Sequence, residues 1–256
     1  MTEPTSPIEV PARLPERISP CPIVEATFEL RFVTTEPWST LPGLLYAAIR
    51  DRYPGKLDLP LAQIPEPLRV SDRRLALKPL IRFEGTGPFA VVCGPRVISL
   101  TTQPNGYPGW RAIETELGWL VSKVVDAAVI HEPERLGVRY IDFFGGNLFD
   151  GIRLGVSIGS ARLRATELQI SATLDQWEPF DVRLTTANNA AIKSGEADVR
   201  RGSVLDVDVG LRALDFEMSL ESLLPRFADA HKISKQVFFG LLKPEFLATL
   251  NPEYAS

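Results

Sequence analysis

Apolar and polar residues alternate strictly near the start of the chain, from Val24 to Phe32. An alternation with a period of two predicts a β-strand, here over about residues 22–33. One face of this strand carries only apolar side chains, and the other carries Glu25, Thr27, Glu29 and Arg31. A charged face of this kind is either a solvated sheet surface or one wall of a binding site.

The rest of the first half mixes helix and strand patterns. A helix is expected after Gly43, and apolar residues at helical spacing predict a second helix that Gly109 opens. Residues 54–72 are rich in proline and are expected to form an irregular connection. The expected strands are Leu75–Phe83, Phe89–Cys93, Val97–Thr101 and Glu134–Phe144, of which the first three form an antiparallel meander.

The second half shows strand patterns followed by helix patterns. Strands are expected near 152–158, 162–174, 180–187 and 203–211. A long helix follows with Ser219 as a candidate N-cap, but Pro225 favours a helix start near Leu224. A last short helix is expected over Pro244–Leu250.

These patterns predict an α+β fold, with antiparallel sheets backed by helices and a long C-terminal helix. The similar order of elements in the two halves suggests a duplication, although no residue-level repeat supports it. We expect a flexible N-terminal arm over residues 1–17, an α+β half over 18–146, and antiparallel strands plus C-terminal helices over 147–256.

The composition is ordinary for a globular protein, with 45% hydrophobic and 23% charged residues. The net charge of −4 disfavours nucleic acid as a partner, because broad nucleic-acid binding needs clustered Lys and Arg. A local basic patch stays open, formed by Arg162, Arg164, Arg200 and Arg201. No run reaches the ~18 apolar residues of a membrane helix, so we expect no membrane partner and a cytoplasmic location. Cys21 and Cys93 are expected to be reduced and buried.

No catalytic or metal-binding motif stands out. His131 and His231 lack ligands or nucleophiles at suitable spacing, and we expect surface or helix-terminal positions for both. Gly155–Gly159 matches the letters of the G-x-S-x-G nucleophile elbow, but the residues after it predict a strand instead of the required helix. We therefore expect no catalytic residue, no metal and no cofactor.

The charged strand faces supply most of the candidate binding residues, which are Glu25, Glu29, Arg31, Trp110, Arg139 and Asp142. If the strand Glu134–Phe144 neighbours the first strand, Glu29 is expected to pair with Arg139 across the sheet. Trp110 belongs to a group of aromatic residues near loops, which serve the core by default and mark an interaction surface if exposed. Two interpretations stay open: ordinary cross-strand pairs on a solvated face, or a groove that binds a partner or a small ligand.

Four segments in this order resemble a sporadically distributed family of prokaryotic proteins of about this length. They are Pro22–Phe32, Tyr107–Trp110, Glu134–Asp142, and Ala230–Leu247 with Tyr254 behind it. The resemblance covers nearly the whole chain and departs at Ile233–Lys235, where members usually carry Asp or Glu. The family brings no established activity, cofactor or site residue. Its patchy distribution implies a mobile, accessory or defence gene that acts with a partner encoded nearby.

Three functions remain as hypotheses. The leading one is a non-enzymatic, cytoplasmic protein-binding module, an accessory or antitoxin-like partner in a prokaryotic defence or toxin system, with a homodimer left open. The first alternative is a small-ligand module of helix-grip type, which rests on fold analogy. The second is an enzyme with an unrecognised carboxylate site. Glu25 and Glu29 cannot form its dyad, because four residues of one strand separate them by about 13 Å.

Overall fold

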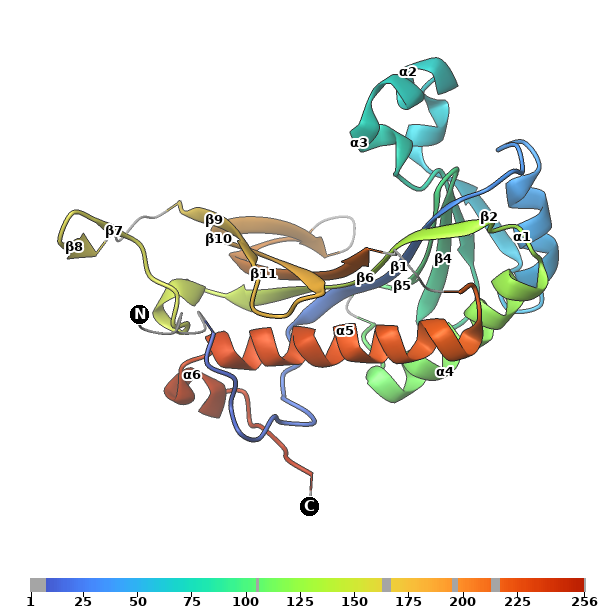
Figure 1. Cartoon of the computed structure of the whole chain (residues 1–256). Helices are drawn as coiled ribbons and strands as arrows, with labels where there is room; N and C mark the ends of the chain where they lie inside the picture. The colour runs from blue at the N-terminus through green and yellow to red at the C-terminus, as the bar shows by residue number, and fades with distance from the viewer. Residues whose placement is uncertain (1–7, 105, 163–166, 195–197, 213–216, 256) are drawn as a thin grey trace, which may run out of the picture. The chain divides into compact units, whose positions relative to one another are not determined.

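Figure 1 shows the protein as a computed structural model that describes residues 8–104, 106–162, 167–194, 198–212 and 217–255. The elements of its first half are β1 (Ile23–Val33), α1 (Leu41–Ile49), β2 (Gly55–Asp58), η1 (Pro60–Gln63), α2 (Glu66–Ser71), α3 (Arg73–Ala76), β3 (Ile81–Glu84), β4 (Phe89–Gly94), β5 (Val97–Thr102), α4 (Trp110–Asp126) and β6 (Glu132–Gly145). The second half contains η2 (Leu148–Asp150), β7 (Ser157–Ile158), β8 (Ala161–Arg162), β9 (Gln169–Leu174), β10 (Phe180–Ser194), β11 (Asp198–Arg212), α5 (Leu220–Leu241) and α6 (Pro244–Ala248).

Within these described ranges, nine strands form one sheet in the order β2-β3-β4-β5-β1-β6-β11-β10-β9, and β7 pairs with β8 separately. Neighbouring strands run antiparallel, as the registers of β1 with β5 and of β9 with β10 show. The expected α+β fold, with an antiparallel sheet and a long C-terminal helix, here α5, is therefore confirmed. The duplication of two similar halves stays a prediction.

The chain groups into two compact units, and each is assembled from separate stretches of sequence. Unit 1 comprises the chain up to Val24, Arg139–Val209, and the chain from His231 onward. Unit 2 comprises Glu25–Val138 and Gly210–Ala230. Neither unit can form from one continuous segment, so both depend on contacts between residues that are distant in the sequence.

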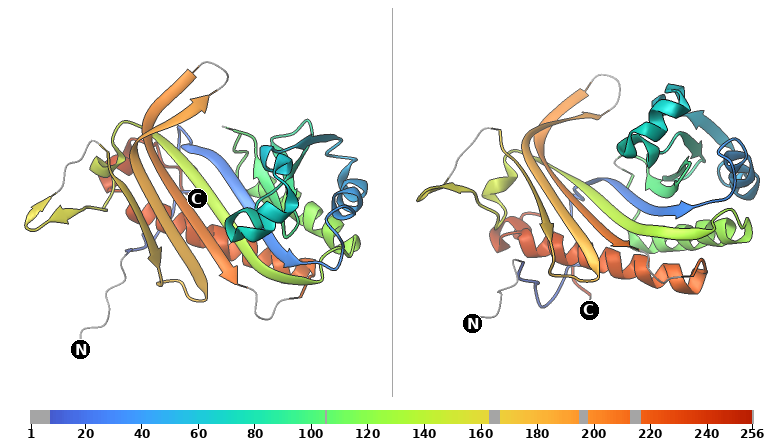
Figure 2. Two further views of the ribbon diagram at one scale, coloured as in Figure 1. Left: turned by 90° about the horizontal axis from the view of Figure 1, so that it is seen from above. Right: turned by 45° about the horizontal axis from the view of Figure 1, so that its top comes forward.

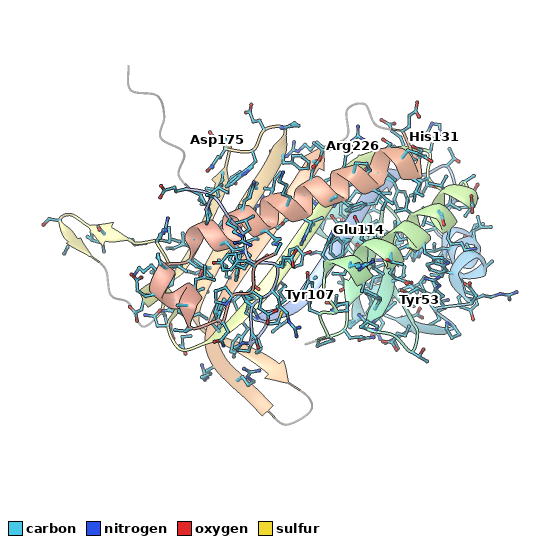
Figure 3. All side chains as sticks on the ribbon, turned by 90° about the horizontal axis from the view of Figure 1, so that it is seen from below. Tyr53, Tyr107, Glu114, His131, Asp175 and Arg226 are labelled. Atoms are coloured by element: carbon cyan, nitrogen blue, oxygen red, sulfur yellow. The ribbon has the colours of Figure 1, made fainter. Side chains whose placement is uncertain are left out.

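In unit 2, one face of the strands is packed against helices. The alternation along β1 points its apolar side chains to this face, where Phe28 is 1% exposed. The residues of α4 that recur at helical spacing are buried there too, namely Ile113, Leu117, Leu120, Val121 and Val124. Figure 3 shows this helix side, with Glu114 on α4 and Arg226 on the first turns of α5. The opposite face of the same strands holds the polar residues of β1.

In unit 1, the apolar core lies between the strands and the last two helices. The ring of Phe144 on β6 stacks on Phe238 of α5 at a centroid distance of 6.4 Å and meets Phe246 of α6 at 5.6 Å. The strands β10 and β11 contribute buried residues from one face, namely Val182, Leu184, Leu205 and Val207.

The described part of the expected N-terminal arm is packed onto unit 1. Ile8 is buried, and its backbone exchanges two hydrogen bonds with the side-chain amide of Gln176, at 3.1 and 2.9 Å. The backbone N–H of Glu16 donates to the carbonyl of Glu253 at 2.7 Å. These contacts join residues 8–17 to unit 1, and the first seven residues lie outside the described part of the chain.

Several elements agree with the sequence patterns. The strands expected at 22–33, 89–93, 97–101 and 134–144 are β1, β4, β5 and β6. The helix that Gly109 opens is α4, and Gly109 has a φ of 93°, in the region that favours glycine. The last short helix is α6, and Ser219 caps α5, since its hydroxyl accepts a hydrogen bond from the N–H of Ser222 at 3.1 Å.

Two expected strands are wrong. Residues 75–83 are not one strand, because α3 ends at Ala76 and β3 begins only at Ile81. A short apolar run fits a helix as well as a strand, so its periodicity could not decide. Residues 152–158 contain only the two-residue strand β7, preceded by a turn in which Ile152 is fully buried. The strand expected at 162–174 is β9 over its second part, and residues 163–166 lie outside the described ranges.

Three further expectations are corrected. The proline-rich connection contains β2, η1 and α2. The helix α5 does not start near Leu224 but at Leu220, with Pro225 inside it. A proline this close to the N-terminus removes one intrahelical hydrogen bond, and the burial of Phe227 at 1% exposure offsets that loss. Cys21 is exposed, whereas Cys93 is buried as expected and burial raises the pKa of its thiol to about 12.

Candidate functional site

The polar face of β1 lies in register with residues of three neighbouring strands in unit 2. Glu29 is opposite Ser99 of β5, Ser99 is opposite Val92 of β4, and Val92 is opposite Arg82 of β3. Residues directly opposite in antiparallel strands point to the same side of a sheet. Arg82, Ser99 and Glu29 therefore share one face, on the side away from Phe28.

Glu29 is the centre of a charged cluster on this face. Its Oε1 lies 2.7 Å from Nε of Arg31, and it accepts a hydrogen bond of 3.0 Å from Nη1 of Arg135 on β6. The Glu29 and Arg135 side chains are each 19% exposed, and Arg31 is 31% exposed. Both guanidinium groups approach the same carboxylate oxygen, so Glu29 holds the two arginines beside each other. We call Glu29, Arg31 and Arg135 the Glu29 cluster.

Arg31 has donors that the described residues do not use. Its Nε is buried and makes no hydrogen bond, because its approach to Glu29 lacks suitable geometry. None of the described residues accepts a hydrogen bond from the rest of its guanidinium either. Buried polar groups nearly always have partners, and a guanidinium is shaped to bind a carboxylate with two parallel hydrogen bonds. Arg31 is therefore the group of this cluster best suited to contact another molecule.

Two glycines make room for Arg135. A Cβ atom at Gly137 would lie 2.3 Å from its Nη1, and a Cβ atom at Gly210 of β11 would lie 2.3 Å from its Nη2. The guanidinium thus occupies space that any other residue at these positions would fill. Arg135 was not among the binding residues predicted from the sequence. The sequence does carry one signal for Arg135: an isolated glycine inside a strand, such as Gly137, often marks the close approach of another group.

The segment between β2 and β3 covers part of this face. Arg31 is opposite Val97, and Val97 is opposite Gly94, so the three point to one side of the sheet. A Cβ atom at Gly94 would lie 2.4 Å from the carbonyl oxygen of Lys78, which places that segment over the face. This cover explains why Ser99 is buried at 3% exposure although it is opposite a glutamate.

The same segment presents apolar side chains to solvent. Leu68 and Val70 of α2 are 60% and 65% exposed, whereas Arg69 between them is buried and its Nε donates to the carbonyl of Ile64 at 2.8 Å. Figure 2 shows α2 and α3 on the side of these strands away from α4. This side of unit 2 therefore combines a charged cluster with exposed apolar groups, the mixture found in protein–protein interfaces.

Trp110 lies on the other side of β1 from Glu29, so the two cannot form one patch. Its ring centroid is 5.9 Å from that of Phe28, whose ring in turn lies 6.4 Å from Phe227 of α5. The void between these helices and the sheet measures only about 20 Å³, which is room for about one water molecule. Trp110 belongs to a packed helix–sheet interface that leaves no space for a small ligand.

The remaining predicted site residues occupy three different environments. Glu25 is exposed at the start of the polar face of β1, where its carboxylate accepts a hydrogen bond of 3.3 Å from Thr27 Oγ1. Arg139 in unit 1 donates from Nε and Nη2 to both carboxylate oxygens of Asp206 on β11, at 2.8 and 2.6 Å. The expected Glu29–Arg139 pair is therefore wrong, because the register of the strands gives each residue another partner.

Asp142 lies on the opposite face of β6 from Arg139 and is 2% exposed. Loss of hydration, together with the nearby negative charge of Asp206, raises the pKa of its carboxyl to about 8. No described residue donates a hydrogen bond to this carboxyl. A group so deeply enclosed cannot reach a substrate in solution, so Asp142 is a buried acid and not a surface contact.

His231 is neither a surface nor a helix-terminal residue, contrary to expectation. It lies in the middle of α5, and its Nδ1 is 2.8 Å from the hydroxyl oxygen of Tyr140. Tyr140 is buried and lies on β6, two positions before Asp142. Burial, with the positive charge of Lys235 one turn later, lowers the pKa of His231 to about 3. The imidazole is therefore neutral at physiological pH and serves as a hydrogen-bonding group in the core of unit 1.

Comparison with models of known protein families and with curated proteins finds no match for this chain. The resemblance to a sporadically distributed prokaryotic family therefore stays a prediction. Among the described residues there is no group of three His, Cys, Asp or Glu side chains arranged to hold a metal ion. No helix in the described ranges is both long and apolar enough to cross a membrane. Of the expected basic patch, Arg164 lies outside those ranges.

Proposed function

We propose that this protein is a non-enzymatic protein-binding module, and that the Glu29 cluster on unit 2 contacts an acidic side chain of its partner. The observation that carries the proposal is Arg31, a partly exposed guanidinium whose buried Nε makes no hydrogen bond. The carboxylate of Glu29 and the glycines around Arg135 hold two arginines close together. Two neighbouring guanidinium groups suit a carboxylate, because charge-assisted bidentate hydrogen bonds are stronger than neutral ones.

The partner is proposed to be a protein and not a small molecule for two reasons. The void of about 20 Å³ on the helix side of the same strands cannot hold a ligand. On the side of the Glu29 cluster, α2 exposes Leu68 and Val70, which supply the apolar contacts that a protein partner buries. Arginine is one of the residue types enriched in interaction hot spots, which supports Arg31 as the main contact of this surface.

The biological role follows from the family resemblance and is part of the same proposal. We infer an accessory or antitoxin-like protein of a prokaryotic defence or toxin system, acting in the cytoplasm on a protein encoded nearby. The enzyme alternative has less support, because the carboxyl of Asp142 is sealed from solvent at 2% exposure. The small-ligand alternative lacks room at the helix–sheet interface of unit 2.

The test is purification of the tagged protein from its own host, with neighbouring genes intact, followed by native mass spectrometry. The expected result is one stoichiometric polypeptide with the wild-type chain. The variant Arg31→Glu should lose it, because the reversed charge repels an acidic partner and removes the bidentate donors. Arg31→Lys keeps the charge without the planar fork and should bind measurably more weakly.

The matched control is Arg111→Glu, which reverses one arginine charge at an exposed position of α4, on the opposite side of the unit 2 strands from the cluster. This variant should recover the same polypeptide as the wild type. Equal recovery with Arg31→Glu and with the control would refute the assignment of the Glu29 cluster. A bare chain in every purification would refute the binding function itself.

A further inference from the structure

The two edges of the nine-stranded sheet differ in how well they are protected against pairing with another strand. The edge strand β2 has four residues, among them the charged Lys56 and Asp58, and prolines flank it at Pro54 and Pro60. Charges, prolines and short length are the features that keep an edge from pairing with other chains. The opposite edge strand β9 has six residues without charge, proline or glycine. It is therefore the edge open to strand addition.

The outward backbone groups of β9 belong to Gln169, Ser171 and Thr173. The carbonyl of Leu168 accepts a hydrogen bond from the N–H of Asn188 at the start of the β9–β10 pairing, so the backbone groups of Leu168 face β10. Backbone groups alternate along an antiparallel strand, so the even-numbered residues of β9 face β10 and the odd-numbered residues face outward. The register of β9 with β10, in which Thr185 is opposite Ser171, continues this pairing without a bulge. Within the described ranges, no residue makes a hydrogen bond with the outward backbone N–H or C=O groups of Gln169, Ser171 and Thr173.

The sequence of this edge is symmetric about Ser171. The apolar residues Leu168, Ile170, Ala172 and Leu174 alternate with the polar residues Gln169, Ser171 and Thr173. A two-fold axis at Ser171 brings Ile170 of one copy opposite Ala172 of the other, and Gln169 opposite Thr173. Apolar residues thus meet apolar residues on one face, and polar residues meet polar residues on the other. Ile170 and Leu174 are only partly buried, so a second copy would extend the apolar face that they begin.

We propose that two copies of this chain pair through β9 in an antiparallel, two-fold symmetric ladder centred on Ser171. The outward residues of the two strands then exchange both backbone hydrogen bonds at each of the three opposed pairs. We infer that the occupant is a second copy because β9 is complementary to itself. Its outward backbone groups and its apolar residues are arranged symmetrically about Ser171, and it carries no charge that would repel an identical strand. The surface differs from the Glu29 cluster, which lies in unit 2, so the two proposals can fail separately.

The first test is the mass of the purified chain in solution, by light scattering after size exclusion at micromolar concentration. The wild type should have twice the mass of the 28.3 kDa chain. Ser171→Pro removes an outward N–H without breaking the ladder to β10, and should give a monomer with an unchanged circular dichroism spectrum. The matched control Ser171→Ala keeps the N–H and should remain a dimer. A wild-type monomer, or a Ser171→Pro dimer, overturns the proposal.

The second test fixes the register. In a hydrogen-bonded antiparallel pair the two Cα atoms lie about 5.5 Å apart, which suits a disulfide. Ser171→Cys, made with Cys21→Ser because Cys21 is exposed, should therefore form an intermolecular disulfide under mild oxidation. The matched control Gln169→Cys places the two thiols four residues apart along the strands, about 13 Å, and should stay reduced. Cross-linking at position 169 but not at position 171 would refute the symmetric register.

The third test uses the charges at the strand ends. In this register Glu167 of one copy lies opposite Asp175 of the other, at both ends of the ladder. Like charges in these positions repel, so the dimer should tighten as salt is added. Asp175→Lys turns both repulsions into attractions and should lower the dimer dissociation constant about tenfold. An unchanged or larger constant for Asp175→Lys contradicts the pairing, whatever partner binds elsewhere.

Discussion

The strongest quantitative expectation concerns Asp142, the fully buried acid of unit 1. Substitution by asparagine keeps the shape of the side chain and removes its titration. Burial raises the pKa of Asp142 from the ordinary value of 3.8 to about 8 in the folded protein. The neutral acid is therefore the form that the fold accommodates, and Asp142→Asn should stabilise the protein at neutral pH.

The sign and size of the effect follow from proton linkage. Below about pH 4 the carboxyl is neutral in both the folded and the unfolded chain, so the free energy of unfolding is not reduced by this group. As the pH rises toward 8, the unfolded chain loses this proton and the folded chain keeps it, so stability falls. Each pH unit costs about 1.4 kcal/mol, which amounts to about 4 kcal/mol between the ordinary pKa and pH 7. The asparagine variant does not suffer this loss.

The assay is urea unfolding of the wild type and Asp142→Asn at several pH values between 4 and 8, followed by circular dichroism. The difference in unfolding free energy should be small near pH 4 and reach several kcal/mol at pH 7. Glu178→Gln, which changes an exposed carboxylate in the same unit, is the control and should give a difference below about 0.5 kcal/mol. A stabilisation that does not change with pH, or a destabilised variant at pH 7, would refute the reasoning.

Four smaller effects are expected. Gly210→Ala places a Cβ atom against the guanidinium of Arg135, and this flexible side chain can move aside. The free energy of unfolding should therefore change by less than about 1 kcal/mol, whereas partner binding, measured by calorimetry, should weaken. Ser219→Ala removes the N-cap of α5 and should cost about 1 kcal/mol in thermal or urea unfolding. His231 should stay neutral from pH 8 to pH 5 in an NMR titration, because burial lowers its pKa to about 3; a chemical-shift midpoint near pH 6 would contradict its burial. Since the unfolded chain takes up this proton first, His231 should also make the protein less stable as the pH falls below about 6.

The sequence predicted best where a pattern is both local and long. The strict alternation along β1 and the helical spacing of α4 are properties of one segment, and both elements form as expected. Prediction was weaker where an apolar run is short, as before β3, or where local propensity conflicts with packing, as at Pro225 of α5. In these places contacts with distant segments decide the conformation.

The candidate site was predictable only in part for the same reason. The polar face with Glu29 and Arg31 is visible in the alternation, but the pairing of Glu29 with Arg135 depends on the register between strands more than 100 positions apart. The packing of Trp110 on Phe28 separates it from Glu29, because adjacent residues of β1 point to opposite faces.

The sequence by itself therefore determined the long periodic elements of this protein, such as β1 and α4, and which of their residues face the same side. Only the tertiary structure decided which strands are neighbours, and with them the partners of the charged side chains. The physical reason is the range of the interactions: periodicity acts over a few residues, whereas strand pairing, burial and the resulting pKa shifts of Asp142 and His231 arise between residues that the sequence keeps far apart.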